Sequence, residues 1–553
     1  MCSVAAIACE FAPPAMADAV PRPRLLSTSE IPAPLPVESY AGLPRFEPME
    51  PCFIPIGATP HRCGYVVVPA DRSQPGGQTI HLGVVVFESQ TRPAAADPIL
   101  FARGGPGGSV MALAEFAQVF QPDWFTQPNQ TRDLIFFDQR GTAFARPHLN
   151  CPGYGTARIQ SAQRGASTEQ TAEAIAEAIQ ACAQPWEQQG WDLSVFNSLE
   201  TAADINDIRS VLGYDQINFF GSSYGTMLGQ HLMYRYPEIL RSVTLDSPFP
   251  LSANWGGGQA PLRQQVLEQV FAACTASEAC RTAYPDLEER TEQLHASLQQ
   301  QPLTVTLQPQ SQLSLGLSSE GSLEVPVNGD LLSTALIDSL YTPEGVASFP
   351  YFIEAVEQGN IQVLGNEFGL SLQPDDTLAL LMHFTVVCAE DADYRLEDVR
   401  FEGAGAIARG YSHLDTLQYL KVCDRLQLET LPASVDSPVV SDIPTLVLSG
   451  QFDPATPPSL LSQILPTLGN AYSYTFPDGA HGQLWPFGNC SAQIFDRFIQ
   501  NPLTAPDGTC VEAGSLEFYI PQVRWGTGDL GRKAEGRMKP VQGRLLLVQI
   551  PQR

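Results

Sequence analysis

The stretch Ile217-Asn218-Phe219-Phe220-Gly221-Ser222-Ser223-Tyr224-Gly225, followed by the apolar run Met227–Tyr236, decides how this chain folds. It predicts a short buried strand, a Gly-x-Ser-x-Gly turn and a helix, the context of a nucleophile elbow. Side chains at Gly221 and Gly225 would collide with neighbouring backbone, which distinguishes such an elbow from an ordinary Gly/Ser turn. We therefore expect Ser223 to expose its hydroxyl and Tyr224 to present its amide at a helix N-terminus, where it can stabilise an oxyanion.

Other short apolar runs on both sides of this turn predict the rest of a sheet. Ile99–Ala102, Leu134–Asp138 and Val243–Asp246 have the composition of central parallel strands, buried on both faces. Between them, Thr168–Cys182 and Ser198–Leu212 carry apolar residues at helical spacing. This alternation of strands and helices predicts an α/β fold.

The strand rhythm stops after residue 247 and returns at Pro444–Ser449 and Tyr472–Phe476. Residues 260–300 and 330–430 read as helical, and 303–327 as a possible hairpin. The simplest organisation is one α/β domain interrupted by a helical cap. We divide the chain into the following segments: 1–17, a signal peptide; 18–50, a Pro-rich lead-in; 51–247, the first part of the core; 248–435, the cap; 436–520, the second part of the core; and 521–553, a basic tail without an assigned role.

A serine nucleophile needs a base, and the chain has only eight histidines. His481 lies in the Gly-rich loop Pro477-Asp478-Gly479-Ala480-His481-Gly482, directly after the last predicted strand. By itself it would be read as an ordinary surface histidine. The orienting acid should lie between serine and histidine in the chain. Asp453 does so, in the loop after a strand, whereas the rival Asp478 is better explained as a turn residue.

A second oxyanion donor is expected from the glycine-rich loop Arg103-Gly104-Gly105-Pro106-Gly107-Gly108-Ser109. Glycines there let backbone amides approach a substrate closely. We expect Gly105 to donate, with Gly104 as the alternative. The loop fits neither a dinucleotide-binding nor a P-loop pattern, so phosphate binding is rejected.

Composition narrows the classes of function. The chain has 31 basic and 59 acidic residues, a formal net charge of −28, which argues against nucleic-acid binding. With 44% hydrophobic residues it can form a large core. No apolar stretch is long enough to span a membrane. Oligomeric state cannot be derived from these features.

The twelve cysteines indicate the compartment. The leader Met1–Ala17 ends in an Ala-x-Ala cleavage pattern but lacks a basic start, and lipoprotein anchoring at Cys9 is a weaker alternative. The remaining ten cysteines fall into sequence-local couples, which favours export and disulfides over buried free thiols. Local pairing is the simplest connectivity: 52–63, 151–182, 274–280, 388–423 and 490–510.

Five ordered motifs resemble one family. They are Arg103–Ser109, Asp138-Gln139-Arg140-Gly141-Thr142, Gly221–Thr226, Gly450-Gln451-Phe452-Asp453-Pro454 and Gly479-Ala480-His481-Gly482. Together they are similar to the secreted, disulfide-bearing branch of the tripeptidyl aminopeptidase and proline iminopeptidase group, over about residues 45–515. The resemblance implies an α/β-hydrolase fold with a mostly parallel central sheet and a helical cap. It also implies a serine exopeptidase acting on peptides with a free N-terminus, through Ser223, Asp453 and His481, with the amides of Tyr224 and Gly105. Ala143 and Phe144 depart from the family pattern, so that loop can differ.

An aminopeptidase must also hold a protonated amine. Cys388-Ala389-Glu390-Asp391 lies where this family often has an acid after a cysteine. We therefore expect Glu390, or as a second choice Asp391, to bind the substrate amine. The alternative is that these acids only cap or solvate a helix. Arg140 is interpreted as a structural ion-pair or turn residue. No metal or organic cofactor is required.

Two other functions remain open at this point: an esterase or lipase with the same triad, and a catalytically silent exported binding protein. Epoxide- or halide-hydrolysing chemistry is disfavoured because the elbow holds Ser rather than Asp.

Overall fold

The central sheet carries the predicted elbow. The computed structural model describes residues 42–521 except 57–58, 75–76, 113, 115–127, 308–322, 365–376, 392–393 and 485–488. The leader, most of the Pro-rich lead-in and nearly all of the basic tail therefore lie outside the described residues. Within the described part, nine strands form one sheet in the order β1-β2-β3-β5-β4-β6-β7-β10-β11. Their bounds are Arg45–Pro48 (β1), His61–Pro69 (β2), Thr79–Phe87 (β3), Ile99–Ala102 (β4), Leu134–Phe137 (β5), Ile217–Ser222 (β6), Leu240–Asp246 (β7), Thr445–Gly450 (β10) and Ala471–Phe476 (β11).

The sheet is mostly parallel, as predicted. Strands β5, β4, β6, β7, β10 and β11 pair in parallel, whereas β1, β2 and β3 form an antiparallel edge that joins β5. Parallel neighbours place their carboxyl ends at one edge of the sheet. The loops after β4, β6, β7, β10 and β11 therefore leave from the same edge, and these loops contain the predicted site residues.

The central strands β3, β4, β5 and β6 contribute side chains to two cores. In β3, Val84 and Val86 face one side and pack with α5 (Ser198–Val211) and α6 (Tyr224–Arg235). Val85 and Phe87 face the other side, where α15 (Asn489–Gln500) supplies Phe495 and Phe498. Burial on both faces explains why the central strands read as continuous apolar runs rather than alternating patterns.

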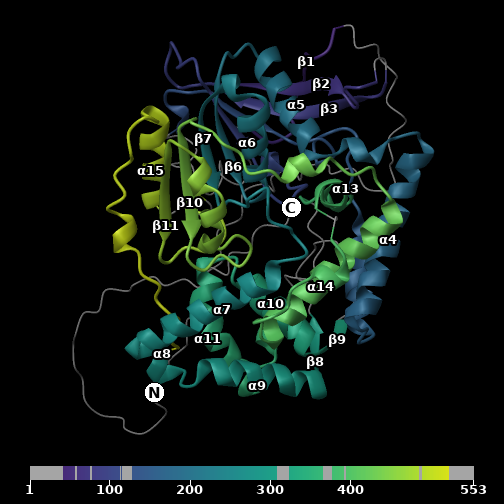
Figure 1. Ribbon diagram of the computed structural model, residues 1–553, viewed down its shortest axis with the longest axis vertical. Helices are drawn as coiled ribbons and strands as arrows, with labels where there is room; N and C mark the ends of the chain where they lie inside the picture. The colour runs from purple at the N-terminus through teal and green to yellow at the C-terminus, as the bar shows by residue number, and fades with distance from the viewer. Residues whose placement is uncertain are drawn as a thin grey trace, which may run out of the picture.

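Between β7 and β10 the chain leaves the sheet and forms a second, mainly helical body, which we call the insertion. Its elements are α7 (Gln259–Ala276), α8 (Glu278–Ala283), α9 (Leu287–Gln300), the antiparallel pair β8 (Leu303–Leu307) and β9 (Leu323–Val327), α10 (Gly329–Ser339), α11 (Pro343–Glu357), α13 (Leu380–Glu390) and α14 (Ala406–Leu426). Most of the insertion lies below the sheet in Figure 1, whereas α13 lies beside the sheet. The pairing of β8 with β9 confirms the predicted hairpin.

The helical body also recruits an earlier part of the chain. Helices α3 (Pro152–Gln163) and α4 (Thr168–Gln188) lie between β5 and β6 in sequence. Ile159 and Ala162 of α3 belong to the hydrophobic cluster of the insertion, and α4 runs alongside α14 (Figure 1). Phe452 and Ala480, the neighbours of Asp453 and His481, are buried in the same cluster. The loops with the predicted acid and base are thus packed into the insertion as well as the sheet.

Five disulfides join the ten cysteines within the described residues: Cys52–Cys63, Cys151–Cys182, Cys274–Cys280, Cys388–Cys423 and Cys490–Cys510. The predicted local pairing is confirmed. The bonds close between 6 and 35 residues of chain, so each joins segments that are near each other in the sequence. No helix in the described part of the chain is long and apolar enough to cross a membrane.

Candidate active site

Ser223 lies at the turn between β6 and α6 in a backbone conformation that side chains rarely adopt, with φ 55° and ψ −125°. The flanking glycines make that turn possible. A Cβ atom at Gly221 would lie 2.1 Å from the carbonyl oxygen of Gly225, and one at Gly225 would lie 2.6 Å from that of Ala102. Both positions therefore exclude a side chain, and the strained turn holds Ser223 at the start of a helix.

The predicted acid and base are hydrogen-bonded to each other. Nδ1 of His481 lies 2.9 Å from both carboxylate oxygens of Asp453, rather than pairing with the rival Asp478. A carboxylate can only accept, so Nδ1 carries the proton and Nε2 is left to accept one. Asp453 is fully buried and also accepts from the hydroxyl and amide of Thr456. The imidazole keeps 16% of its side-chain surface exposed, so it remains accessible from outside.

Burial and nearby charges shift the pKa values of both His481 and Asp453. Burial by itself lowers the pKa of His481, but attraction to Asp453, their hydrogen bond and the nearby Asp246 raise it above its ordinary value. Burial raises the pKa of Asp453, but His481 and Thr456 outweigh this and leave it below its usual range. The carboxylate therefore stays ionised beside an imidazole that accepts a proton readily.

A short segment at the end of β7 joins the elbow to the histidine loop. The amide of Ser223 donates to the carbonyl oxygen of Asp246 at 2.9 Å. The Asp246 carboxylate accepts the amides of Gln483 and Leu484 at 2.7 and 2.9 Å, and the Ser247 hydroxyl accepts the amide of Gly482 at 2.8 Å. Asp246 thus contacts both the backbone of Ser223 and the loop that carries His481, and Ser247 contacts that loop as well.

The glycine-rich loop after β4 lies against Ser223. A Cβ atom at Gly104 would approach the Cβ and Oγ of Ser223 to 2.5 and 2.8 Å. The backbone amides of Gly105 and Tyr224 have no hydrogen-bond partner among the described residues. Two unengaged amides near a serine hydroxyl are the donors that an oxyanion hole needs.

Glu390 ends α13 and is buried. Its two oxygens accept from the amide and hydroxyl of Ser198 at 2.6 and 2.7 Å, and the same hydroxyl lies 2.7 Å from the phenol oxygen of Tyr224. Burial raises the pKa of Glu390 to about 7. Asp391 is also buried, and its carbonyl oxygen accepts from Asn254 at 2.7 Å. Of the two predicted amine anchors, Glu390 is therefore linked to Tyr224 through the Ser198 hydroxyl and holds the first turn of α5.

Arg140 has the structural role that the sequence analysis assigned to it. Its guanidinium is fully buried and donates two parallel hydrogen bonds, both 2.8 Å, to the carboxylate of Asp204. It also donates to the carbonyl oxygens of Ala70 and Val195. With all these contacts internal to the core, Arg140 is not placed to hold a substrate.

The insertion contacts the predicted base directly. The amide of His481 donates to the carbonyl oxygen of Tyr341, which follows α10, at 3.3 Å. The two rings meet edge to face with centroids 5.2 Å apart. The insertion therefore forms one wall beside the imidazole.

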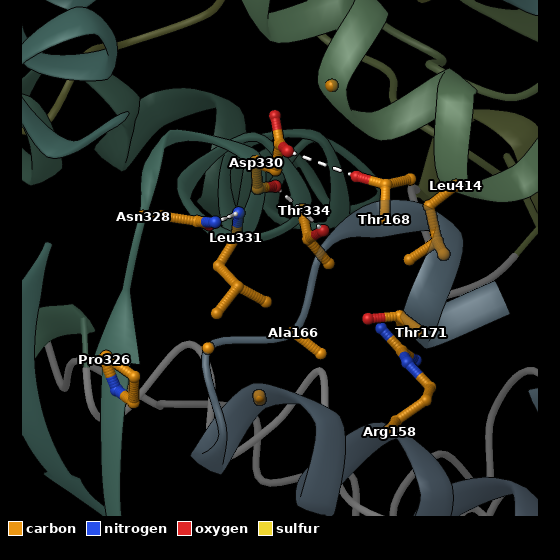
Figure 2. A pocket seen from close by; sticks show the side chains of 13 residues that line it. Arg158, Ala166, Thr168, Thr171, Pro326, Asn328, Asp330, Leu331, Thr334 and Leu414 are labelled. Atoms are coloured by element: carbon orange, nitrogen blue, oxygen red, sulfur yellow. Dashed lines mark hydrogen bonds between the residues drawn. The ribbon is translucent and has the colours of Figure 1, made fainter. Parts of the chain in front are cut away.

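A pocket opens elsewhere, between the α3–α4 turn, β9, α10 and α14 (Figure 2). None of the predicted site residues lines it. Its polar groups are largely engaged with each other: Thr168 donates to Asp330 at 3.2 Å, and Asn328 accepts the amide of Leu331 at 2.9 Å (Figure 2). We assign it no part in the chemistry.

Three residues that contact the site were not predicted from the sequence: Asp246, Tyr341 and His383, whose Nδ1 lies 3.2 Å from the carbonyl oxygen of Pro106 in the glycine-rich loop. Asp246 ends a predicted strand at the edge of the sheet that carries the other site residues, and that position was an available signal. Tyr341 and His383 come from the insertion, and nothing in their local sequence places them beside loops of the core.

Two family models match separate segments of the chain. A model for the alpha/beta hydrolase fold matches residues 97–299, and one described as TAP-like protein matches residues 412–510. The first segment contains Ser223, and the second contains Asp453 and His481. The chain has the α/β-hydrolase fold, and the resemblance to the tripeptidyl aminopeptidase and proline iminopeptidase group is confirmed.

Known proteins align with part of the chain. A tripeptidyl aminopeptidase from Streptomyces coelicolor is 29% identical over 221 residues, which cover 37% of this chain and 38% of the relative. The serine protease Hip1 from Mycobacterium tuberculosis is 31% identical over 241 residues, covering 41% and 43%. The matches thus span less than half the length of these relatives. A proline iminopeptidase structure from Mycobacterium smegmatis covers 79% of this chain and 98% of that chain at 16% identity, with a TM-score of 0.33, too distant to support an argument.

Proposed function

We propose that this chain, an α/β-hydrolase with a TAP-like C-terminal segment, is an exported serine aminopeptidase that releases short N-terminal peptides or single residues. The hydrogen bond between His481 and Asp453, at the sheet edge that also carries the strained turn of Ser223, is the observation that carries the proposal. The similarity to a tripeptidyl aminopeptidase and a serine protease supports a peptide as the substrate.

In the proposed mechanism, Nε2 of His481 takes the proton from Ser223 as the serine oxygen attacks the scissile carbonyl carbon. Asp453 keeps the proton of Nδ1 in place and stabilises the imidazolium. The amides of Tyr224 and Gly105 hold the carbonyl oxygen while it is negative, and losing one such donor typically costs about 3 kcal/mol in the barrier. The C–N bond then breaks, and the imidazolium gives its proton to the leaving amine.

Water completes the cycle by the same route. His481 takes a proton from the water, whose oxygen attacks the ester carbon of the acyl-enzyme. The ester bond breaks, Ser223 recovers its proton from His481, and the product leaves as a carboxylic acid. The helices of the insertion, which contact His481 through Tyr341, would restrict this site to small peptides.

Substrates with free and blocked N-termini test the proposal. The protein should cleave peptidyl-naphthylamides with a free amine and turn over their acetylated counterparts far more slowly. An esterase would prefer p-nitrophenyl esters to both peptides. Equal turnover of free and acetylated peptides would exclude an aminopeptidase. Mass spectrometry of a digested peptide pool then counts the residues removed per cut.

A fluorophosphonate probe tests the nucleophile. The wild-type protein and the exposed-serine control Ser210→Ala should be labelled, and Ser223→Ala should not be. An unlabelled wild-type protein would favour the silent binding protein.

Export is part of the proposal. Five disulfides are typical of extracellular or periplasmic proteins, since thiols stay reduced in the cytosol. We expect the mature chain to begin at Asp18, after the predicted leader. N-terminal sequencing of the secreted protein checks this, and a lipid-modified Cys9 would point to the anchored alternative.

A further inference from the structure

The loop Arg103–Ser109, which we call the oxyanion loop, is fixed to the core by the end of β5. The side-chain nitrogen of Gln139 donates to the carbonyl oxygen of Arg103 at 2.8 Å. The buried carboxylate of Asp138 accepts from the Ser109 hydroxyl at 2.9 Å and from the amide of Val110 at 2.9 Å. These contacts hold the two ends of the loop and leave its middle to other partners.

The insertion holds the middle of the loop. The amide of Ser109 donates to the carbonyl oxygen of Thr377, and the amide of Ala379 donates to that of Gly107, both at 2.9 Å. Gly108 and Leu378 form an antiparallel bridge between these bonds. A side chain at Gly107 would lie 2.6 Å from the carbonyl oxygen of Ala379. The segment before α13 therefore pairs with the oxyanion loop as a short piece of sheet.

His383, one turn further along α13, reaches the part of the loop next to Gly105. Its Nδ1 lies 3.2 Å from the carbonyl oxygen of Pro106, and its Nε2 lies 3.2 Å from the phenol oxygen of Tyr419 on α14. A carbonyl oxygen can only accept, so Nδ1 carries the proton and Nε2 accepts from Tyr419. Burial lowers the pKa of His383 to about 4, so the ring is neutral near pH 7.

A neutral buried histidine with one fixed tautomer donates its hydrogen bond in one direction only, and so holds its acceptor in one position. The loop needs one, because Gly105 and Gly107 both have positive φ, at 125° and 94°, and glycines leave many backbone conformations open. Fixing the carbonyl group of Pro106 holds the residue after Gly105 in place, which limits the backbone conformations open to Gly105, whose amide is the proposed oxyanion donor.

We propose that the insertion supplies part of the catalytic machinery: His383 is a positioning residue that holds the oxyanion loop in its donating geometry through the carbonyl group of Pro106. The inference rests on the proposed serine-hydrolase function and does not depend on the choice between peptide and ester substrates. It gives the insertion a task beyond limiting access, because the oxyanion hole is complete only when α13 is seated on the loop.

Three variants separate this role from simple packing. His383→Leu removes the Nδ1 donor and puts an apolar side chain of moderate size in its place. His383→Asn places an amide nitrogen near the position of Nδ1. Tyr419→Phe removes only the hydrogen bond to Nε2 of His383, and its ring still packs against Phe384. The readouts are kcat and KM on the best chromogenic substrate, the rate of fluorophosphonate labelling and the melting temperature.

We expect His383→Leu to lower kcat and the labelling rate about 10- to 100-fold with little change in KM, since outright loss of an oxyanion donor typically costs about 100- to 1000-fold. His383→Asn should recover most of the loss, and Tyr419→Phe should lose about two- to tenfold, the value of one hydrogen bond. If His383 only filled space, His383→Asn would not recover kcat or the labelling rate.

Other outcomes overturn the proposal. If Leu and Asn behave alike, whether active, inactive or unfolded, or if Leu changes only KM or the melting temperature, His383 does not position the loop. A wild-type protein that is labelled, beside an unlabelled Ser223→Ala, shows in either case that the proposed serine nucleophile stands, on which this inference rests. A wild-type protein that is not labelled at all removes both the proposed function and this inference.

Discussion

At the scale of single residues, His481 lies near two carboxylates rather than one. Asp453 bonds to its Nδ1, and the buried Asp246, which binds the amides of Gln483 and Leu484, also raises its pKa. Burial raises the pKa of Asp246 itself to about 6. Asp246 is therefore ionised, and able to stabilise the imidazolium, only above about that pH.

This arrangement predicts the acidic limb of the pH profile. His481 acts as a base only when neutral, and its pKa lies above the ordinary value of about 6.5. Activity should therefore fall, as pH decreases, with a midpoint above about 6.5. Asp246→Asn keeps one acceptor oxygen but removes the charge, so it should move the midpoint of kcat/KM to lower pH. Asp496→Asn on α15 is the control that should not. An unshifted midpoint in Asp246→Asn, with an unchanged melting temperature, would contradict this account.

Glu390 is a second residue with a testable role, because it binds Ser198 and is also predicted to bind the substrate amine. Both oxygens already accept from Ser198, yet a carboxylate has further lone pairs for an amine. If Glu390 anchors the substrate amine, Glu390→Gln should raise KM for free-amine peptides about tenfold, equivalent to about 1.4 kcal/mol, and leave acetylated peptides unaffected. A lower melting temperature with unchanged KM would instead assign Glu390 to holding α5 alone.

At the scale of elements, the disulfide Cys388–Cys423 ties α13 to α14 and closes a separation of 35 residues, whereas Cys274–Cys280 closes one of 6. Both bonds lie within the insertion. The larger loop gives up more conformational entropy when it is closed in the unfolded chain. Removing a bond should therefore cost more stability for the first pair than for the second.

The expected losses in the free energy of unfolding are about 4 kcal/mol for the double variant Cys388→Ala/Cys423→Ala and about 2 kcal/mol for Cys274→Ala/Cys280→Ala. Denaturant unfolding curves of the two variants, measured in parallel, provide the test. A larger loss for the second pair would show that local packing, and not loop closure, dominates the contribution of these bonds.

At the scale of the whole molecule, the net charge of −28 should act on substrates before they bind. A negative field concentrates cationic ligands, and salt screens it, because the Debye length falls from about 30 Å at 0.01 M to about 3 Å at 1 M. We expect kcat/KM for free-amine peptides to decrease by up to about tenfold across this range. An uncharged p-nitrophenyl ester is the matched control and should change little. Equal salt dependence of both substrates would exclude attraction of the amine.

The fold was accessible from sequence because its signals are local. Runs buried on both faces marked the central strands, and β4 begins and ends at the predicted residues Ile99 and Ala102. The two glycines of the elbow also carry a local signal, since their Cβ atoms would strike backbone within the same strand–turn–helix unit or in the adjoining strand. Neighbouring cysteines gave the disulfide pairing for the same reason.

The strands of the sheet, the turn at Ser223 and the pairing of the cysteines could be predicted from the sequence, as could the places of Asp453 and His481 after two strands, because each follows from burial, backbone sterics or chain order. Three other features became visible only once the whole chain was packed: Asp246 bridges the elbow and the histidine loop, α3 joins the insertion, and Thr377 and His383 contact the oxyanion loop. Those contacts join residues far apart in the chain. Local pattern carries no information about which distant surfaces meet, since that choice depends on the packing of the complete core.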